Sequence, residues 1–429
     1  MGAFGNFILV LAMLTAAILV HEIGHFIAAR LFGVRVLTFS IGMPPRLFGV
    51  KRGDTDYVVS AIPVGGYVKL AGDDWGEGEP APDELMAKPW WARIGIYVAG
   101  VSVNIVFAYL IFFASIMNGV EIQEYLAVIG PVAARTEAAR AGLKAGDRAV
   151  RAAGREVRNW DDLADAIGTG IEANKRVTVE FARGGRRVRA VFLTATLTGL
   201  VPGLKPVIGS VAPALPARKA GLMKGDRVVA VDGHTIRWWS EMSERISKAK
   251  PDVAIAVQVM REGKPMTFTV KPRWDAGQGR SIIGVNAMPS STELRRFPVT
   301  QALKYAGAEV YIMGREIVVS FWRLLRGKAK FQDVIGGPVL ITQVGMEKAR
   351  EGIWELLHFM GVLNVGLCVA NLLPLPVVDG GMILMAFVEG IRRRRFSPRV
   401  YNVVNYVGVV LLVLIMLTAT YHDILRWLF

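Results

Sequence analysis

The sequence predicts a polytopic α-helical membrane protein that carries a small β-rich loop and two copies of a compact α+β domain. Three observations lead to this fold class. Hydrophobic residues make up 52% of the 429 residues and are gathered into blocks. Several blocks are close to the roughly 20 residues that cross a bilayer as a helix. One long, more polar stretch between two of the blocks contains an internal repeat.

Four apolar blocks are predicted to span the membrane. They lie at about residues 4–30, 94–119, 354–373 and 400–420. The first block belongs to the segment 1–32, which has no basic start and no small-residue cleavage site, so we expect it to stay as an anchor. The third belongs to a longer segment, 352–391, that two prolines interrupt.

A cluster of arginines predicts the orientation of the chain. Arg392–Arg395 and Arg399 lie between the third and fourth blocks, and short basic loops stay in the cytoplasm. Both termini are then expected outside, the loop 33–93 inside, and the long insert from about 120 to 350 outside. The insert is also basic, which favours anionic headgroups or acidic partners, or is simply a solvated surface.

The loop 33–93 is predicted to contain short strands. Val34–Ser40, Tyr57–Ile62 and Tyr67–Leu70 are rich in β-branched and aromatic residues. Turns are expected at Gly53 and at Gly65–Gly66. These patterns together predict a small cytoplasmic β-sheet.

The long insert contains two copies of one domain, predicted at 122–204 and 205–290. Val128-Ile129-Gly130 and Ala141-Gly142-Leu143 both recur 79 residues later, and so does Gly146-Asp147-Arg148. Cys368 is the only cysteine, so no disulfide can form within the chain. Each copy must therefore fold on its hydrophobic core alone.

Each copy has an AGLxxGDR block followed by alternating apolar residues, which predicts a short helix, a tight turn and a strand. Asp147 and Asp226 follow a glycine at equivalent places and are predicted to form turns. The copies resemble PDZ domains, which bind extended peptides by strand addition. A role as spacers without a ligand is the alternative. After them, 298–331 is predicted as an amphipathic helix that lies in the membrane interface or packs on the two copies.

Two histidines and a glutamate lie inside the first apolar block. His21, Glu22 and His25 form the pattern HExxH, which places both imidazoles on one face of a helix. Two such imidazoles can bind one Zn²⁺ while Glu22 takes a proton from the attacking water. Ionisable groups are costly in hydrocarbon, so they indicate function here. Alternatively, both histidines only hydrogen-bond to neighbouring carbonyl groups.

Asp379 is the candidate for a third zinc ligand. It follows Pro374 and Pro376, which break the third block, and irregular backbone at membrane depth is tolerated where it lines a watery cavity. The first and third blocks run in the same direction and both carry these groups late, so we expect them to meet near the cytoplasmic side. Asn371, beside the break, is a candidate for substrate contact or for a bond between helices.

With these motifs the chain resembles the bacterial site-2 protease family, in its RseP type with two PDZ domains. The likeness extends over nearly the whole chain. It rests on HEIGH, on IPVGGYVKL at 62–70, on Gly100 and Asn104 in the second block, and on NLLPLPVVDGG near the C-terminus. Two residues depart from the family pattern, Val101 in place of a common proline and Met382 in place of a frequent histidine. Neither is expected to bind the metal.

The resemblance implies an intramembrane zinc metalloprotease of the bacterial inner membrane, with periplasmic PDZ domains. In it, His21, His25 and Asp379 would hold Zn²⁺, Glu22 would be the general base, and Asn371 would help to hold the substrate. The expected substrates are single-span membrane proteins already trimmed by another protease, such as a membrane-bound anti-sigma factor or remnant signal peptides. The lipid bilayer and PDZ peptide ligands are further partners, and nucleic acid is not expected.

Other classes of protein fit the sequence less well. A non-catalytic PDZ-containing membrane receptor would explain the insert but has no use for HExxH paired with an aspartate. A membrane-anchored protease of soluble substrates would carry HExxH in a hydrophilic domain, and a transporter would need more spans. For the insert we expect a size filter, in which the PDZ pair excludes substrates with bulky outer domains.

Overall fold

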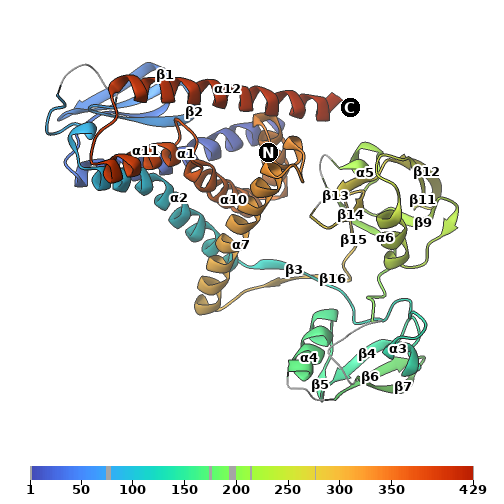
Figure 1. Cartoon of the computed structure of the whole chain (residues 1–429). Helices are drawn as coiled ribbons and strands as arrows, with labels where there is room; N and C mark the ends of the chain where they lie inside the picture. The colour runs from blue at the N-terminus through green and yellow to red at the C-terminus, as the bar shows by residue number, and fades with distance from the viewer. Residues whose placement is uncertain are drawn as a thin grey trace. The chain divides into compact units, whose positions relative to one another are not determined.

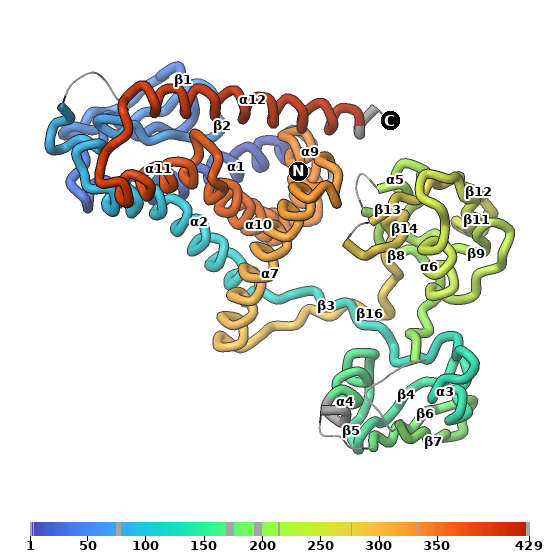
Figure 2. Tube along the Cα trace, in the orientation of Figure 1, coloured from blue at the N-terminus to red at the C-terminus, as the bar shows by residue number. Residues whose placement is uncertain are grey.

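The computed structural model describes residues 2–73, 79–172, 176–192, 200–212, 215–275 and 277–428. The chain divides into two compact units, which Figures 1 and 2 trace by colour along the sequence. The membrane unit consists of Met1–Gly119 and Arg296–Phe429, and the inserted unit is Val120–Arg295.

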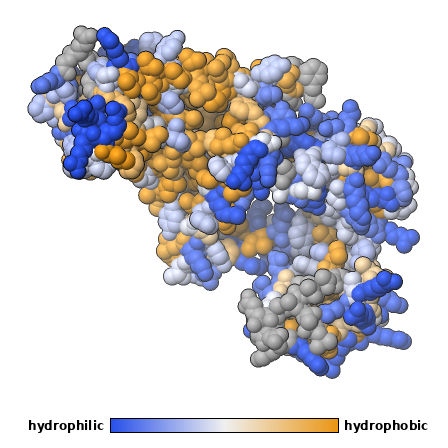
Figure 3. Space-filling model, in the orientation of Figure 1, coloured by the Kyte–Doolittle hydropathy of each residue, from blue (hydrophilic) through white to orange (hydrophobic). Residues whose placement is uncertain are grey.

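Four helices of the described chain are long and apolar enough to cross a membrane. They are α1 (Ala3–Leu31), α2 (Trp90–Asn118), α10 (Ile353–Leu372) and α12 (Pro398–Leu428). The prediction of four membrane helices is confirmed. Hydrophobic residues cover much of this unit in the view of Figure 3, whereas the surface of the inserted unit is mostly hydrophilic. Helix α2 packs against both α1 and α10.

The segment 352–391 forms two helices, because α10 ends at Leu372 and α11 (Asp379–Arg392) begins after a short break. The two glycines after Asp379 permit this break. A Cβ on Gly380 would lie 2.3 Å from the Leu373 carbonyl oxygen, and one on Gly381 would lie 2.0 Å from that of Leu375. No larger residue fits at either position, so the glycines let the start of α11 pack against the preceding turn.

The loop after α1 forms β1 (Val36–Arg52) and β2 (Thr55–Leu70), an antiparallel pair. The predicted turn at Gly53 is confirmed, since the strands join there. The predicted turn at Gly65–Gly66 is confirmed as a reversal inside β2, because the residues before and after it pair with the same residues of β1 in opposite directions. Gly65 has a φ of +76°, a conformation that glycine adopts readily where the chain turns. The first part of β1 lies between the two arms of β2, so that Ser40 pairs with both Val58 and Tyr67.

Helix α7 (Val299–Leu325) occupies most of the predicted amphipathic segment. It packs on α2 and α10, and its side chains Ala302 and Ala306 are fully buried there. Two membrane spans therefore cover one face of α7. The sequence predicted an interfacial position or packing on the two copies, and did not predict this contact. The short η1 (Leu85–Ala87) and α8 (Phe331–Val334) and the longer α9 (Pro338–Glu351) complete the membrane unit.

The inserted unit contains two four-stranded sheets with the equivalent orders β5-β4-β6-β7 and β10-β9-β11-β12. The first sheet comprises β4 (Arg148–Ala152), β5 (Arg155–Glu156), β6 (Val177–Arg183) and β7 (Arg186–Phe192). The second comprises β9 (Arg227–Val231), β10 (His234–Thr235), β11 (Ile255–Arg261) and β12 (Lys264–Val270). Each sheet has its own hydrophobic core.

Two helices accompany each sheet. They are α3 (Glu137–Arg140) and α4 (Trp160–Glu172) for the first, and α5 (Pro216–Lys219) and α6 (Trp239–Lys248) for the second. Further short strands are β8 (Ile208–Val211), β13 (Arg273–Asp275), β14 (Arg280–Ile282) and β15 (Val285–Ala287). At the ends of the unit, β3 (Val120–Glu124) pairs with β16 (Ser291–Arg295). The unit therefore begins and ends in one two-stranded ribbon.

Candidate metal centre

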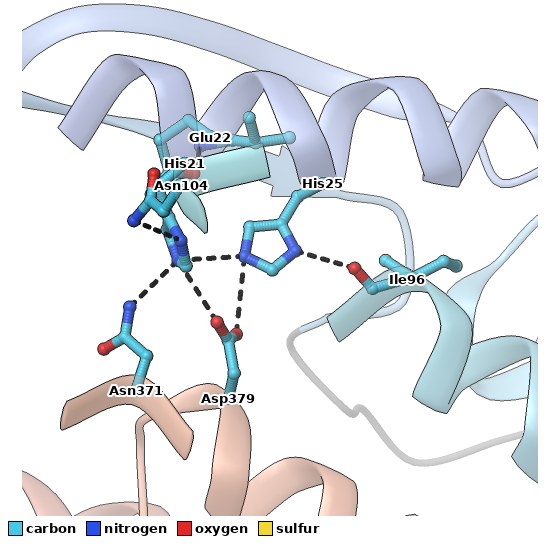
Figure 4. A network of polar contacts seen from close by, with 8 residues as sticks. His21, Glu22, His25, Ile96, Asn104, Asn371 and Asp379 are labelled. Carbon is cyan, nitrogen blue, oxygen red and sulfur yellow. Dashed lines mark hydrogen bonds and ion pairs between the residues drawn. The ribbon is translucent and has the colours of Figure 1, made fainter. Parts of the chain in front are cut away.

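Three side chains from two helices meet inside the membrane unit (Figure 4). His21 and His25 come from α1 and Asp379 is the first residue of α11. The two histidine Nε2 atoms are 3.1 Å apart. The Asp379 carboxylate lies 3.1 Å from His21 Nε2 and 3.4 Å from His25 Nε2. One ligand atom from each residue therefore lies within 4.8 Å of the others.

This set of donor atoms fits a zinc ion. Zinc takes imidazole nitrogen and carboxylate oxygen, and a catalytic site has three protein ligands and one open position. Ligands about 2.0–2.1 Å from a tetrahedral ion lie roughly 3.3 Å from one another, which is close to the separations here. The two ring nitrogens lie 3.1 Å apart and both face the Asp379 carboxylate. Such an arrangement can hold one cation between them.

The ring of His25 is oriented by the backbone of α2. Its Nδ1 lies 2.9 Å from the Ile96 carbonyl oxygen. Since a carbonyl can only accept, Nδ1 carries the proton and Nε2 keeps its lone pair for a metal. Hydrogen bonds of this kind hold the metal-binding tautomer in many metal sites.

Asn104 faces the other histidine from α2. It is fully buried, and its Nδ2 lies 3.5 Å from His21 Nδ1. In the sequence, Asn104 contributed only to a family resemblance, and no role in the site was predicted for it. The signal that could have found it is a polar residue in an apolar span, which commonly faces the bundle interior.

Glycines allow α1 and α2 to approach closely at the site. A Cβ on Gly24 would lie 2.6 Å from the Ala99 carbonyl oxygen. A Cβ on Gly100 would lie 2.4 Å from His25 Nε2 and 2.9 Å from His21 Cε1. Small residues let membrane helices cross at short range, and here they leave room for both imidazoles.

Glu22 does not belong to the group of three candidate ligands. Its Oε2 accepts a hydrogen bond of 3.0 Å from the Val68 backbone amide of β2. This bond ties the carboxylate of α1 to the β1–β2 pair, next to the histidines that flank it in sequence. A carboxylate beside the ligands is the arrangement that a general base needs.

Asn371 reaches the same cluster from the last turn of α10. Its Nδ2 lies 3.2 Å from His21 Nε2, and Figure 4 places it on the same side as Asp379. Because the nitrogen and oxygen of an amide are assigned from the hydrogen-bond network, the side chain can present a donor or an acceptor at the site.

The two departures from the family pattern lie in packed surroundings. Val101 is buried inside α2, which is helical without interruption at this point. Met382 packs against the core that contains Val36 and Ile96. Neither residue belongs to the group of three ligands.

Comparison with known proteins gives a consistent result. Residues 9–415 match the model of peptidase family M50. The chain is 31% identical to the regulator of sigma-E protease RseP of Escherichia coli, with 98% of both chains covered. It is 30% identical to protease RseP of Yersinia pestis, over 95% of this chain and 96% of the relative.

A zinc metalloprotease of Geobacillus kaustophilus, RasP, is 29% identical, with 96% of both chains covered. A solved PDZ domain of Listeria monocytogenes covers 20% of this chain at 22% identity, with a TM-score of 0.18. The family model and the full-length relatives, together with a His-His-Asp group in a membrane unit, lead to one conclusion. The chain belongs to peptidase family M50 and is a membrane metalloprotease of the site-2 type.

Proposed function

We propose that this protein cleaves single-span membrane proteins within the bilayer, with Zn²⁺ held by His21, His25 and Asp379. The observation that carries the proposal is the meeting of three ligand atoms within 4.8 Å in a unit built from four apolar helices. A protease with this site inside its membrane unit has substrates that reach it through the bilayer.

Glu22 is proposed as the general base and acid. When bound, zinc supplies Lewis acidity, which makes water at the site more acidic and the scissile carbonyl more electrophilic. Glu22 accepts the proton of the attacking water and then delivers it to the departing amine. The Val68 amide bonds to one carboxylate oxygen, which leaves the other free to take part.

The substrate is proposed to bind as an extended strand. A transmembrane helix hides its carbonyl groups in internal hydrogen bonds, so it must unwind before attack. The β1–β2 pair lies against Glu22 through Val68, and its strand edges can accept an added strand. Asn371, at 3.2 Å from His21, is placed to hold a backbone group of that strand.

The proposed location is the bacterial inner membrane. The cluster Arg392–Arg395 supports a cytoplasmic position for the α11–α12 connection. The active site then lies near the cytoplasmic side and the inserted unit is periplasmic. A relative named regulator of sigma-E protease supports trimmed, membrane-bound anti-sigma factors as one class of substrate, with remnant signal peptides as a second.

Both domains of the inserted unit are proposed as PDZ domains, on the basis of their equivalent sheets. A pocket of about 700 Å³ lies between α6 and the segment Ser281–Ala287 of the second domain, and Tyr125 and Trp160 from the first domain also line it. Met242 and Ile246 of α6 contribute apolar side chains to it. PDZ domains bind extended peptides in such a groove by strand addition, so an apolar chain end is the ligand that this groove suits.

Substitution of the site residues tests the proposal. The purified full-length protein should contain about one zinc per chain, and His21→Ala or Asp379→Ala should remove it. Glu22→Gln should retain zinc and lose at least about 100-fold in cleavage rate, because it removes a proton-transfer group. The measurements are metal analysis and cleavage of a trimmed single-span substrate in detergent.

Glu316→Gln provides a matched control, because Glu316 lies on the exposed surface of α7. It should retain both zinc and activity. A Glu22→Gln protein with full activity would rule out the proposed role of this carboxylate.

A further inference from the structure

A second polar site lies in the membrane unit, separate from the metal centre. It is a pocket of about 320 Å³ next to the connection between α11 and α12. We call it the basic pocket and define it by four cationic lining residues, Lys88, Arg393, Arg394 and Arg395. None of these four forms an ion pair with another described residue. Figure 3 shows a hydrophilic patch at the end of the hydrophobic surface, where Figure 1 draws this connection.

The acidic group that lines the pocket is already neutralised. Glu389 forms an ion pair with Arg93, and both side chains are 2% exposed. Glu389 also accepts a 2.7 Å hydrogen bond from the Phe396 amide and a bond from the Tyr401 hydroxyl. The partial negative charge at the end of α11, about half an elementary charge, is outweighed by the four cations. The pocket therefore presents a net positive charge to a ligand.

The pocket lies where two membrane helices begin. The candidate spans Trp90–Asn118 and Pro398–Leu425 both start beside it. Trp90 lines the pocket, and Trp90 and Trp91 are 41% and 57% exposed. Tryptophans of this kind concentrate at the level of lipid headgroups, so the pocket is at the depth of lipid phosphate.

An apolar strip leads from the pocket along α11. Leu384, Phe387 and Ile391 are spaced for one helix face and are 47%, 50% and 68% exposed. A free phosphate ion would not contact these apolar side chains, whereas the acyl chains of a lipid would cover them. The strip and the cations together suit a molecule with an anionic head and an apolar tail.

We propose that the basic pocket binds the phosphate of an anionic phospholipid, whose acyl chains lie along Leu384, Phe387 and Ile391. Basic pockets between membrane helices commonly hold such headgroups. The lipid would bridge Lys88, before α2, and the arginines after α11. It would thereby hold the end of the helix whose first residue is Asp379. This site is independent of the proposed reaction.

Native mass spectrometry of the full-length protein in mild detergent tests the proposal, with phosphatidylglycerol as the probe. Phosphatidylglycerol should remain bound at lower concentrations than phosphatidylcholine. Arg393→Gln/Arg394→Gln should weaken its binding by about 10-fold or more, since each basic residue near an anionic headgroup contributes to the affinity. Lys88→Gln, from a different segment, should weaken it as well, which guards against a local folding defect.

Arg392→Gln/Arg399→Gln is the matched control. It removes the same charge from the same cluster, but neither residue lines the pocket, so binding should stay within about 2-fold. Equal losses in both double variants would overturn the proposal, because they would indicate diffuse attraction to the cluster. Equal binding of phosphatidylglycerol and phosphatidylcholine to the unmodified protein would also overturn the proposal. Displacement of the lipid by inorganic phosphate at millimolar concentration would instead identify a site for a free anion.

Discussion

At the scale of single residues, the candidate metal centre requires a position without a side chain next to its two histidines. Gly100 lies directly against both imidazoles, and a Cβ there would be 2.4 Å from His25 Nε2. That atom would occupy the space where His25 faces Asp379. Since the rings are held between α1 and α2, they cannot move away without losing the alignment with the carboxylate.

Gly100→Ala should therefore reduce zinc affinity and cleavage by about 10- to 100-fold, the range seen when groups that orient metal ligands are disturbed. Gly366→Ala in α10 is the control, because its Cβ would meet its nearest neighbour, Ile317, at 4.0 Å. Zinc titration and substrate cleavage are the measurements. Unchanged zinc affinity in Gly100→Ala would contradict the packing of α2 against the two histidines.

At the scale of elements, one ion pair joins the turn before β4 to the end of β6. The buried Asp147 accepts a 2.8 Å bond from the Lys144 amide, which closes the predicted turn. It also binds Arg183 at 2.6 Å. In the second copy, Asp226 and Arg261 form the same contact at 2.7 Å. The sequence predicts the turn role of both aspartates but not their arginine partners.

This pair should make the first domain of the inserted unit sensitive to acid. Burial alone would raise the pKa of Asp147, but the hydrogen bond from Arg183 and the Lys144 amide lower the pKa below its ordinary value. A carboxylate with a depressed pKa stabilises the fold at any pH above its unfolded value, about 4, and loses that contribution as the pH falls through its folded value. Hydrogen exchange in β4 and β6 of the full-length protein, corrected for intrinsic rates, should accelerate below about pH 4.

Asp147→Asn should destabilise this domain at neutral pH and flatten its acid response, because the titrating group is gone. Asp161→Asn, at an exposed position of α4, should leave both unchanged. An identical acid response in Asp147→Asn and the unmodified protein would assign the effect to other groups.

At the scale of the whole molecule, the inserted unit is attached through a ribbon whose two strands are paired. Glu124 of β3 pairs with Ser291 of β16, so both crossings of the chain into the unit lie side by side. Everything between them can be removed without separating the ends, since closing a short loop costs little entropy. The ribbon follows α2 and precedes α7 in the chain, and we propose that the inserted unit acts as the size filter expected from the sequence.

Deletion of residues 128–286, with a flexible linker across the gap, should therefore permit cleavage of untrimmed substrates. Activity on trimmed substrates should change little, since no ligand of the metal centre is removed. Both substrates are to be compared in the same detergent with the intact and the shortened protein. If the shortened protein cleaves trimmed substrates but leaves untrimmed ones uncleaved, the size filter is refuted.

The sequence by itself predicted the four membrane helices, the tandem repeat and the break in the third apolar segment. These features depend on composition, periodicity and local breakers, which are properties of short stretches of chain. It also nominated His21, His25 and Asp379 as one group, because ionisable residues are costly within apolar blocks and commonly mark a functional site there.

Only the tertiary structure decided which groups surround these residues. The Ile96 carbonyl behind His25, Asn104 beside His21 and the Val68 amide on Glu22 come from segments whose local patterns do not indicate such contacts. The packing of α7 on α2 and α10 and the pairing of Asp147 with Arg183 have the same origin. The physical reason is that each contact depends on how distant elements pack, and periodicity records only which face of an element is buried.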